Sequence, residues 1–535
     1  MSSVYCIRNK IKFYRLYSFK LLTLLVKYVK IDIIILKIKG ERKMFEKITP
    51  EQAGISSKTV LKFLKSLEKR DAKSHGFLMM KDGKIFTEAY WTPFHRDFCH
   101  RMYSQTKSFV GVAIGLLEEE GKLSLNDKIV DYFPERIDGK LPKYLEEQTI
   151  RDMLTMSTVG GCRWWFNADD PDRTHLYFND QRPTRPSGTI WEYDSPGSQV
   201  LCSLVEKLSG KTLLDYMKEK LFNEMGVFQT ATVLKCKNGE SWGDSAMVCT
   251  LRDIAAFGQL VMNYGVWEGK RLMNEEYLRI ATSKVVSNVA GAHYSNYHQG
   301  YGYQIWRVAS NGFAFVGMGD QLTVCYPDQK LIFAWTSDNQ GTPLRREMTL
   351  AAIEDILLDD MKDDPLAEDQ AAQRELNEYI STLKLFAVKG EKDSVYRNEL
   401  SDTVYLCEEN PMGITKFSLH FNDEKTGEFR YTNAQGDKVI PFGVNCNVFG
   451  KFPQYGYNND FGGLETTDGF LFDDAASIAW LEEKKLLLYV QVIDRYFGNM
   501  SAIFGFKGDE VCVNFSKTAE FFLMEYEGRL IGRKA

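Results

Sequence analysis

The stretch Ser104-Gln105-Thr106-Lys107, followed by the apolar run from Phe109 to Leu117, is the most informative part of this sequence. The apolar run predicts a buried helix with Gly121 as its C-cap. Ser104 and Lys107 are spaced i, i+3, so they share one helix face. A serine hydroxyl attacks a carbonyl only when a base removes its proton, and a lysine is such a base only when it is held neutral. The stretch therefore predicts a serine nucleophile with a lysine base.

The Ser-x-x-Lys spacing occurs three times, and its surroundings distinguish the copy at Ser104. Ser66 to Lys69 lies in a lysine-rich segment expected to be a solvated helix, and Ser381 to Lys384 lies in a polar segment. Neither environment would keep a lysine neutral. The apolar helix after Ser104 would remove water from Lys107 and favour its neutral form. We therefore expect chemistry at Ser104 and interpret the other two copies as chance matches.

Length and composition are typical of a soluble globular protein with more than one domain. The chain has 535 residues, with 44% hydrophobic residues, 13% aromatic residues and a net charge of -5, whereas one domain usually has roughly 100 to 200 residues. Nothing in this composition indicates a nucleic-acid partner. The ten cysteines include no Cys-x-x-Cys pair, and the seven histidines include no His-x-His or His-Glu-x-x-His spacing. We expect reduced thiols in a cytoplasm, no metal and no cofactor.

Residues 1–43 differ from the rest of the chain in charge. They contain 11 Lys+Arg against 2 Asp+Glu, which leaves 56 against 70 in the remainder. The apolar stretch 21–36 is interrupted by Lys27, Lys30 and Asp32, so it is a poor transmembrane span, and no signal-peptide cleavage site follows it. The codons of Gly40-Glu41 can form a bacterial ribosome-binding site just before Met44. We interpret residues 1–43 as a translated leader outside the native protein, with a basic membrane-surface anchor as the alternative.

The order of helical and strand patterns after Met44 predicts an α+β domain. A helix is expected from Ser56 or Ser57 to about Arg70, and Asp82-Gly83 predicts a hairpin turn. A mainly helical segment, 122–290, comes next. Strands are expected at 302–306, 313–317, 321–326 and 331–336, before a helix over 343–361. We expect the sheet of this domain to be built from both ends of the region.

The C-terminal part predicts a different architecture. After the acidic stretch 359–378, seven short strands are expected at 415–421, 428–432, 477–480, 486–492, 502–506, 510–515 and 521–526. Such spacing predicts an all-β sandwich or barrel. We therefore expect an α+β domain at 44–364, an acidic linker or helix at 365–390, and an all-β domain at 391–535.

The stretch Trp191-Glu-Tyr193-Asp-Ser195 places a tyrosine two residues before a hydroxyl, in a turn that opens a helix. A tyrosine near a lysine can relay a proton to a leaving group. The same pattern alone is typical of an aromatic residue packed at a helix entrance. In combination with Ser104 and Lys107, it favours Tyr193 as a third catalytic residue.

Several stretches occur in the order found in a known family. They resemble the serine β-lactamase-related hydrolases, in particular the class C type and its esterase and 6-aminohexanoate-dimer hydrolase relatives. The stretches are Ser104 to Lys107, Thr149 to Ser157, Tyr193 to Ser195, Leu208-Ser-Gly-Lys-Thr and Tyr301 to Trp306. The resemblance covers roughly 45–361.

The resemblance implies a β-lactamase/transpeptidase-like fold, in which an antiparallel sheet is flanked by helices and joined by a helical subdomain. It also implies an acyl-enzyme mechanism, with Ser104 as nucleophile, Lys107 as base and Tyr193 as proton relay. The substrate would be a small-molecule ester, amide or peptide-like compound. Ser195 belongs to the implied substrate-binding residues.

The third motif of the family is where this chain departs from the lactamases, which have Lys-Thr-Gly or a close variant there. The matching strand reads Gly317-Met-Gly-Asp-Gln321. Without the lysine, a β-lactam carboxylate loses a charge-assisted contact. A literal Lys425-Thr-Gly427 lies at an expected turn of the β domain, and we interpret it as a chance match.

We expect the third-motif residues to help hold the oxyanion. Gly317 and Gly319 would allow close backbone approach, and Gln321 would complete the binding set. The two backbone donors would be the N–H groups of Ser104 and Met318, or Asp320 in place of Met318 after a shift of one residue. The alternative is a tight β-bulge without a catalytic role.

The sequence thus predicts a cytoplasmic serine hydrolase that cleaves a carboxylic ester or amide. The alternative function is a penicillin-binding-like protein, or a D-amino-acid peptidase or sensor, that acylates with little turnover. We expect no nucleic-acid or membrane partner, and the sequence indicates neither an oligomeric state nor a particular substrate. Four aromatic residues are candidates to shape an apolar acyl pocket: Trp164, Trp165, Phe166 and Trp242.

Overall fold

The computed structural model of the protein describes residues 45–162, 170–289, 298–342, 344–457, 470–519 and 523–535. The proposed leader and the aromatic residues Trp164, Trp165 and Phe166 lie outside these residues. Residues 47–535 form one compact unit. Within the described ranges, no helix combines the length and the apolar character needed to cross a membrane.

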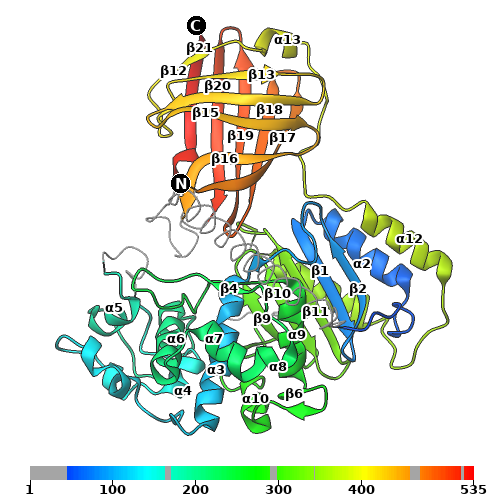
Figure 1. Ribbon diagram of the computed structural model, residues 1–535. Helices are drawn as coiled ribbons and strands as arrows, with labels where there is room; N and C mark the ends of the chain where they lie inside the picture. Colours follow the sequence, from blue (N-terminus) through cyan, green and yellow to red (C-terminus); the bar gives the residue numbers. More distant parts are fainter. Residues whose placement is uncertain (1–44, 163–169, 290–297, 343, 458–469, 520–522) are drawn as a thin grey trace, which may run out of the picture. The chain divides into compact units, whose positions relative to one another are not determined.

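An antiparallel sheet forms the centre of the first region, and its strands come from both ends of that region (Figure 1). Six described strands occur in the order β2-β1-β11-β10-β9-β8. Their bounds are Ser74–Lys81 (β1), Lys84–Tyr90 (β2), Trp306–Arg307 (β8), Phe313–Gly317 (β9), Gln321–Tyr326 (β10) and Leu331–Ser337 (β11). Because β1 pairs with both β2 and β11, the sheet joins the two chain ends as predicted.

The first helix and the hairpin follow directly from the local sequence. Helix α2 spans Ser57–Lys69, and the Ser56 side chain caps it by accepting a hydrogen bond from the Thr59 N–H. Asp82 and Gly83 connect β1 to β2 with φ values of 50° and 74°. Two successive left-handed residues are what a two-residue hairpin turn of type I′ requires, and Asp-Gly adopts them readily. Both predictions are confirmed.

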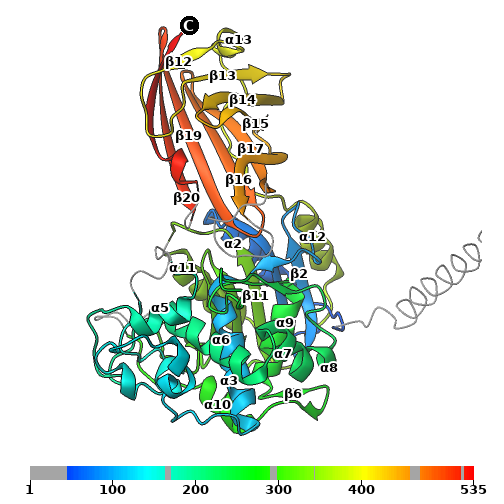
Figure 2. The same cartoon turned by 60° about the vertical axis from the view of Figure 1, so that its left-hand side comes forward.

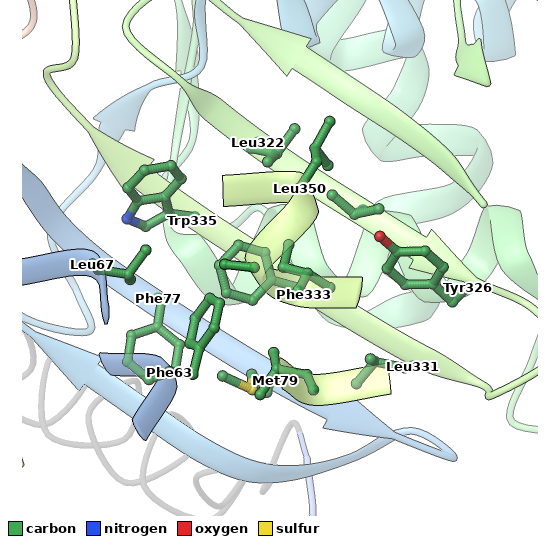
Figure 3. Close-up of a cluster of buried hydrophobic side chains, with 14 of the residues drawn as sticks. Phe63, Leu67, Phe77, Met79, Leu322, Tyr326, Leu331, Phe333, Trp335 and Leu350 are labelled. Carbon is green, nitrogen blue, oxygen red and sulfur yellow. The ribbon is translucent and has the colours of Figure 1, made fainter. Parts of the chain in front are cut away.

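Helices cover both faces of the sheet. Helix α2, α11 (Arg345–Ala352) and α12 (Gln370–Ser381) pack on one face, and α9 (Leu251–Met262) packs on the other. The side chains of β11 alternate accordingly. Figure 3 shows Phe333 and Trp335 among the core residues shared with α2, whereas Ile332 approaches α9 near Gly258. Each fully buried apolar side chain of this kind contributes about 1.5–3 kcal/mol.

The helical segment between β2 and β8 carries the remaining helices of this region. They are α3 (Thr106–Glu119), α4 (Ile150–Leu154), α5 (Arg173–Asn179), α6 (Ser195–Ser209), α7 (Leu213–Met217), α8 (Asn223–Met225) and α10 (Glu275–Ala281). Short strands complete it: β3 (His100–Arg101), β4 (Thr232–Val233), β5 (Met247–Cys249), β6 (Val266–Trp267) and β7 (Lys270–Arg271). The C-cap of α3 is Glu120, so Gly121, which was predicted as the cap and has φ 68°, lies one residue beyond the observed cap.

Two predictions for the end of this region need correction. The strand expected over 302–306 is wrong, because only Trp306–Arg307 pairs with β9. Gln304 has a left-handed φ of 58°, and its side-chain amide donates to the Met153 carbonyl, which bends the chain into a turn. The long helix expected over 343–361 is a shorter α11 followed by a π-helical segment, Ile353–Leu358.

The C-terminal part is an all-β barrel, so the barrel alternative is confirmed (Figure 2): neighbouring strands pair antiparallel, and one parallel pairing closes the sheet. Ten described strands are ordered β15-β14-β13-β12-β21-β20-β19-β18-β17-β16, and β15 also pairs with β17. They span Tyr405–Cys407 (β12), Lys416–Phe421 (β13), Thr426–Asn433 (β14), Gly436–Val444 (β15), Val448–Tyr457 (β16), Phe470–Glu482 (β17), Lys485–Ile493 (β18), Phe497–Lys507 (β19), Glu510–Ala519 (β20) and Gly528–Lys534 (β21).

The strand predicted at 521–526 is wrong. Met524–Tyr526 forms a 3-10 turn after Leu523, which has a left-handed φ of 60°, and Phe521 lies outside the described residues. The last strand is β21, which pairs with both β20 and β12. The sequence did not indicate this strand, because it contains two glycines and three charged residues and few of its side chains are β-branched or aromatic.

A buried carboxyl group in the C-terminal sheet predicts a pH-dependent stability. Asp474 on β17 is fully buried. Burial raises its pKa from 3.8 to about 7, although the Gly450 backbone and Lys451 favour the charged form. The unfolded chain therefore loses this proton at lower pH than the folded chain does. The contribution of Asp474 to stability consequently falls as the pH rises from about 4 to about 7.

We expect Asp474→Asn to raise the free energy of unfolding at pH 8 by up to roughly 4 kcal/mol and to have much less effect at pH 4. Urea unfolding at the two pH values measures this difference. Asp437→Asn, at an exposed position on β15, is the control and should change stability little at either pH. An equal effect of Asp474→Asn at both pH values would contradict the raised pKa.

Candidate active site

Ser104 lies in a short 3-10 turn, Tyr103–Gln105, directly before α3. Two backbone hydrogen bonds at Met102 stabilise the turn. The Met102 N–H donates to the Met247 carbonyl, and the Gln105 N–H donates to the Met102 carbonyl. Tyr103 is buried and has a left-handed φ of 48°. A non-glycine residue in this conformation costs on the order of 1–3 kcal/mol, and such residues cluster at functional sites.

The side chain of Tyr103 contacts the C-terminal sheet. The Phe497 N–H donates a hydrogen bond of 3.1 Å to the Tyr103 hydroxyl. Tyr103 and Phe497 belong to one apolar cluster, against which Met318 also packs. The backbone of β19 therefore helps to fix the residue that precedes Ser104.

Lys107 lies where a base for Ser104 is needed. Its side-chain nitrogen, Nζ, donates to Ser104 Oγ at 3.0 Å and to the Asp244 carbonyl oxygen at 2.7 Å. The residue is 1% exposed. A nucleophile and a base within hydrogen-bond reach are the first requirement for nucleophilic catalysis. The pairing predicted from the i, i+3 spacing is therefore present in the structure.

Asp244 is a carboxyl neighbour of Lys107 that the sequence did not indicate. Its Oδ2 atom lies 3.7 Å from Lys107 Nζ, and both side chains are almost fully buried. Burial raises the pKa of Asp244, whereas Lys107, Arg173 and Arg101 favour its charged form. Asp244 lies in a loop before β5, far from Lys107 in sequence, so no local spacing could have indicated it.

Tyr193 lies beside Lys107 at the entrance of α6. The Lys107 nitrogen is 5.0 Å from the centre of the Tyr193 ring, and this ring stacks on Trp306 with 5.7 Å between the centroids. Between Tyr193 and Ser195, Asp194 caps α6 by accepting from the Gly197 N–H. The Tyr-x-Ser pattern therefore combines a helix cap with a partly exposed tyrosine next to the candidate base.

The third-motif stretch is the hairpin turn between the two strands predicted at 313–317 and 321–326, and both strands are confirmed. Gly317 ends β9, Gln321 begins β10, and the three residues between them connect the strands. Gly319 and Asp320 have left-handed φ values of 72° and 64°. The stretch contains no β-bulge, because β9 and β10 pair in continuous register from Gly317↔Gln321 onward, and its role in holding an oxyanion stays a prediction.

The buried side chain of Gln321 stabilises this turn through hydrogen bonds. It is fully buried, and its side-chain amide donates to the Met318 carbonyl at 3.0 Å and the Ser337 carbonyl at 2.6 Å. Its place after the motif predicted a substrate-binding role. One of its partners, Ser337, lies on β11, which no local pattern reveals.

Gly317 makes the close backbone approach that we predicted. A β-carbon at this position would lie 2.3 Å from the Met102 carbonyl oxygen, two residues before Ser104. No lysine can therefore occupy this position without a shift of the backbone. A different cation lies nearby, because the Arg346 guanidinium from α11 donates to the Gly317 carbonyl and to Asp320 Oδ1, each at 3.1 Å.

One pocket of about 370 Å³ collects most of the candidate residues. Its lining includes Ser104, Tyr193 and Ser195 together with Gly317, Met318 and Trp306. Trp242 does not belong to the pocket lining. It is 3% exposed, and its ring lies 4.6 Å from the Arg101 guanidinium and 4.5 Å from that of Arg173. Trp242 therefore supports the charged cluster beneath the pocket.

The other motif copies make local structural contacts. The Ser66 hydroxyl donates to the Phe63 carbonyl of its own helix, and the Ser381 hydroxyl donates to the Glu378 carbonyl. In the stretch Lys425-Thr-Gly427, the Asp423 carboxylate accepts from the N–H groups of residues 425 and 426. This turn closes the β13–β14 hairpin, in agreement with a chance match.

Comparison with known proteins identifies the family. The family model described as Beta-lactamase matches residues 62–358, which is more than half of the chain. The chain belongs to the Beta-lactamase family. The resemblance noted from the motifs is thereby confirmed.

Individual relatives are distant. Over 247 residues the chain is 22% identical to the 6-aminohexanoate-dimer hydrolase of Paenarthrobacter ureafaciens, covering 43% of this chain and 63% of that protein. The chain thus spans less than two thirds of that relative's length. Among solved structures, the octameric penicillin-binding protein homologue from Pyrococcus abyssi has 16% identity and a TM-score of 0.43, over 89% of this chain and 99% of that chain. The D-amino acid amidase from Ochrobactrum anthropi SV3 has 13% identity and a TM-score of 0.44, over 56% and 98%.

We expect Gly317→Ala to disturb the nucleophile through the Met102 carbonyl. Relief of the 2.3 Å contact should move the backbone before Ser104, destabilise the fold by about 1–3 kcal/mol and slow labelling of Ser104 by a fluorophosphonate roughly 100-fold. Gly505→Ala on β19 is the matched control, because its β-carbon would have no neighbour closer than 3.9 Å. Normal labelling of Gly317→Ala would show that the contact does not position Ser104.

Proposed function

We propose that the chain is a serine hydrolase that cleaves a carboxylic ester or amide through an acyl-Ser104 intermediate. The observation that carries this proposal is the 3.0 Å hydrogen bond from the buried Lys107 nitrogen to Ser104 Oγ. Membership of the Beta-lactamase family supports it. The relative named as a 6-aminohexanoate-dimer hydrolase supports cleavage of an amide as well as of an ester.

In the acylation step, neutral Lys107 accepts the hydroxyl proton while Ser104 Oγ forms a bond to the substrate carbonyl carbon. The carbonyl oxygen becomes an oxyanion, held by the N–H groups of Ser104 and Met318. The proton then passes from Lys107 to the leaving group through Tyr193. The bond to the leaving group breaks, and an alcohol or amine departs from acyl-Ser104.

In the deacylation step, a water molecule attacks the same carbonyl carbon. The Lys107 and Tyr193 pair takes one proton from this water, and the oxyanion forms again between the same backbone donors. The bond to Ser104 Oγ then breaks, the hydroxyl regains its proton, and the carboxylic acid leaves. The two steps together consume one water and require no other reactant.

The pocket favours substrates other than β-lactams. Gly317 offers no cation to a lactam carboxylate, and the Arg346 charge is balanced by the Asp320 carboxylate at 3.1 Å. Trp306 and the partly exposed Tyr193 ring provide an apolar wall instead. The cytoplasmic location and the reduced thiols inferred from the sequence remain predictions.

We expect Ser104→Ala to abolish fluorophosphonate labelling and p-nitrophenyl ester hydrolysis, because it removes the attacking oxygen. Lys107→Ala should lower kcat at least ~100-fold, because the base is lost. Ser66→Ala and Lys69→Ala, at another Ser-x-x-Lys copy, are matched controls that should remain active. Labelling of Ser104→Ala at the wild-type rate would refute the proposed nucleophile.

We also expect kcat/KM for a chromogenic cephalosporin to be at least ~100-fold below that for a p-nitrophenyl ester. The reason is that position 317 carries no cation for the lactam carboxylate, and the nearby Arg346 is paired with Asp320. Parallel steady-state assays measure this ratio. Efficient cephalosporin turnover would contradict the substrate preference. A burst of one product per active site without further turnover on esters would instead favour an acylating sensor.

A further inference from the structure

We propose that Asp244 is the positioning residue of Lys107, so that the site contains a Ser104–Lys107–Asp244 relay. This inference rests on the proposed roles of Ser104 and Lys107. Asp244 contacts the lysine twice, through its carbonyl oxygen at 2.7 Å and through carboxylate Oδ2 at 3.7 Å from Nζ. The carbonyl contact directs the amine toward Ser104 Oγ, and the carboxylate supplies a negative charge beside it.

Burial explains why the lysine needs this carboxylate. Lys107 is 1% exposed and Asp244 is 2% exposed. When Lys107 accepts the proton of Ser104, a full positive charge forms where water cannot reach it, and an unpaired buried charge costs several kcal/mol. The Asp244 carboxylate compensates this charge without taking the proton. In the same way, the carboxylate of a Ser-His-Asp triad stabilises the cation that forms on the base.

The carboxylate must not hold Lys107 permanently as an ammonium, because a protonated lysine cannot act as a base. Two further cations favour the charged form of Asp244, namely Arg173 and Arg101. Arg101 is fully buried and is fixed by hydrogen bonds to the carbonyl and hydroxyl oxygens of Ser245. The two arginines therefore balance the negative charge of Asp244 when Lys107 is neutral. The lysine can consequently release its proton between the steps of the reaction.

Asp244→Asn tests the charge alone, since it keeps the size of the side chain and the backbone carbonyl that accepts from Lys107. We expect the maximal rate of Ser104 labelling by a fluorophosphonate, and kcat for a p-nitrophenyl ester, to fall about 100-fold with KM unchanged. The midpoint of the rise in rate with pH should move to lower pH, because the anion that favours a protonated lysine is gone. A merely structural residue would lower Tm without moving this midpoint.

Asp253→Asn is the matched control. Asp253, in the first turn of α9, is also buried, at 5% exposure, but it accepts from the N–H groups of Phe228 and of the helix cap Thr250. We expect its substitution to lower Tm and to leave the rate and its pH midpoint unchanged. An altered pH midpoint in Asp253→Asn would mean that loss of any buried carboxylate changes the profile, and the inference would fail.

A double-mutant comparison shows whether Asp244 acts through Lys107. In a Lys107→Ala background, Asp244→Asn should cause no further loss of labelling, because the residue that it serves is absent. A further loss of about 100-fold in that background would overturn the inference. Wild-type kinetics of the single variant Asp244→Asn would overturn it as well.

Arg173→Gln provides a second variant in case Asp244→Asn does not fold. Arg173 partly neutralises the Asp244 carboxylate, so without Arg173 this carboxylate favours a protonated Lys107 more strongly. The pH midpoint of labelling should therefore move to higher pH, the opposite direction to Asp244→Asn. An unchanged midpoint in Arg173→Gln would contradict the shared carboxylate. Loss of labelling in Ser104→Ala together with normal kinetics in both charge variants would leave the proposed hydrolase intact and reject only the role of Asp244.

Discussion

The burial of an amine at the start of α3 is the constraint around which this site is built. Every residue from Thr106 to Leu117 is buried, so α3 is a core helix rather than a surface helix with one apolar face. Lys107 is therefore surrounded by protein, and its donors must be satisfied there. The 3-10 turn at Ser104 and the Asp244 carbonyl satisfy two of them. The nucleophile and the loop before β5 are thus held together by one lysine.

The parts of the fold that the sequence predicted depend on neighbouring residues. The Asp82-Gly83 turn, the Ser56 cap and the Ser104–Lys107 pairing each involve positions no more than three residues apart. Their geometry follows from backbone conformation and from the helical repeat. The fold itself was predicted from the order of the family-like stretches, because that order relates distant segments that no local rule connects.

The features that the sequence did not predict depend instead on contacts between residues far apart in the chain. The Gln321 amide reaches Ser337 on β11, a contact that its place after the third motif did not indicate, and its role in substrate binding stays a prediction. Asp244 and Arg346 were missed because they reach the site from a distant loop and from α11, where neither belongs to a recognisable pattern. The strand expected at 302–306 failed because the Gln304 side chain binds a carbonyl at the end of α4. In each case a long-range hydrogen bond outweighed the local preference.

The contact between Gly317 and Met102 links substrate preference to the geometry of the nucleophile. A cationic side chain at position 317 would have to displace the Met102 carbonyl, since even a β-carbon would lie 2.3 Å from it. Met102 in turn fixes the turn that carries Ser104, through the Gln105 N–H and the Met247 carbonyl. A single substitution therefore cannot restore the lysine of the third motif and preserve the position of Ser104. A change toward lactam substrates would require the β9–β10 turn and the segment before α3 to move together, so the close approach that presents the nucleophile also restricts the substrates that this scaffold can bind.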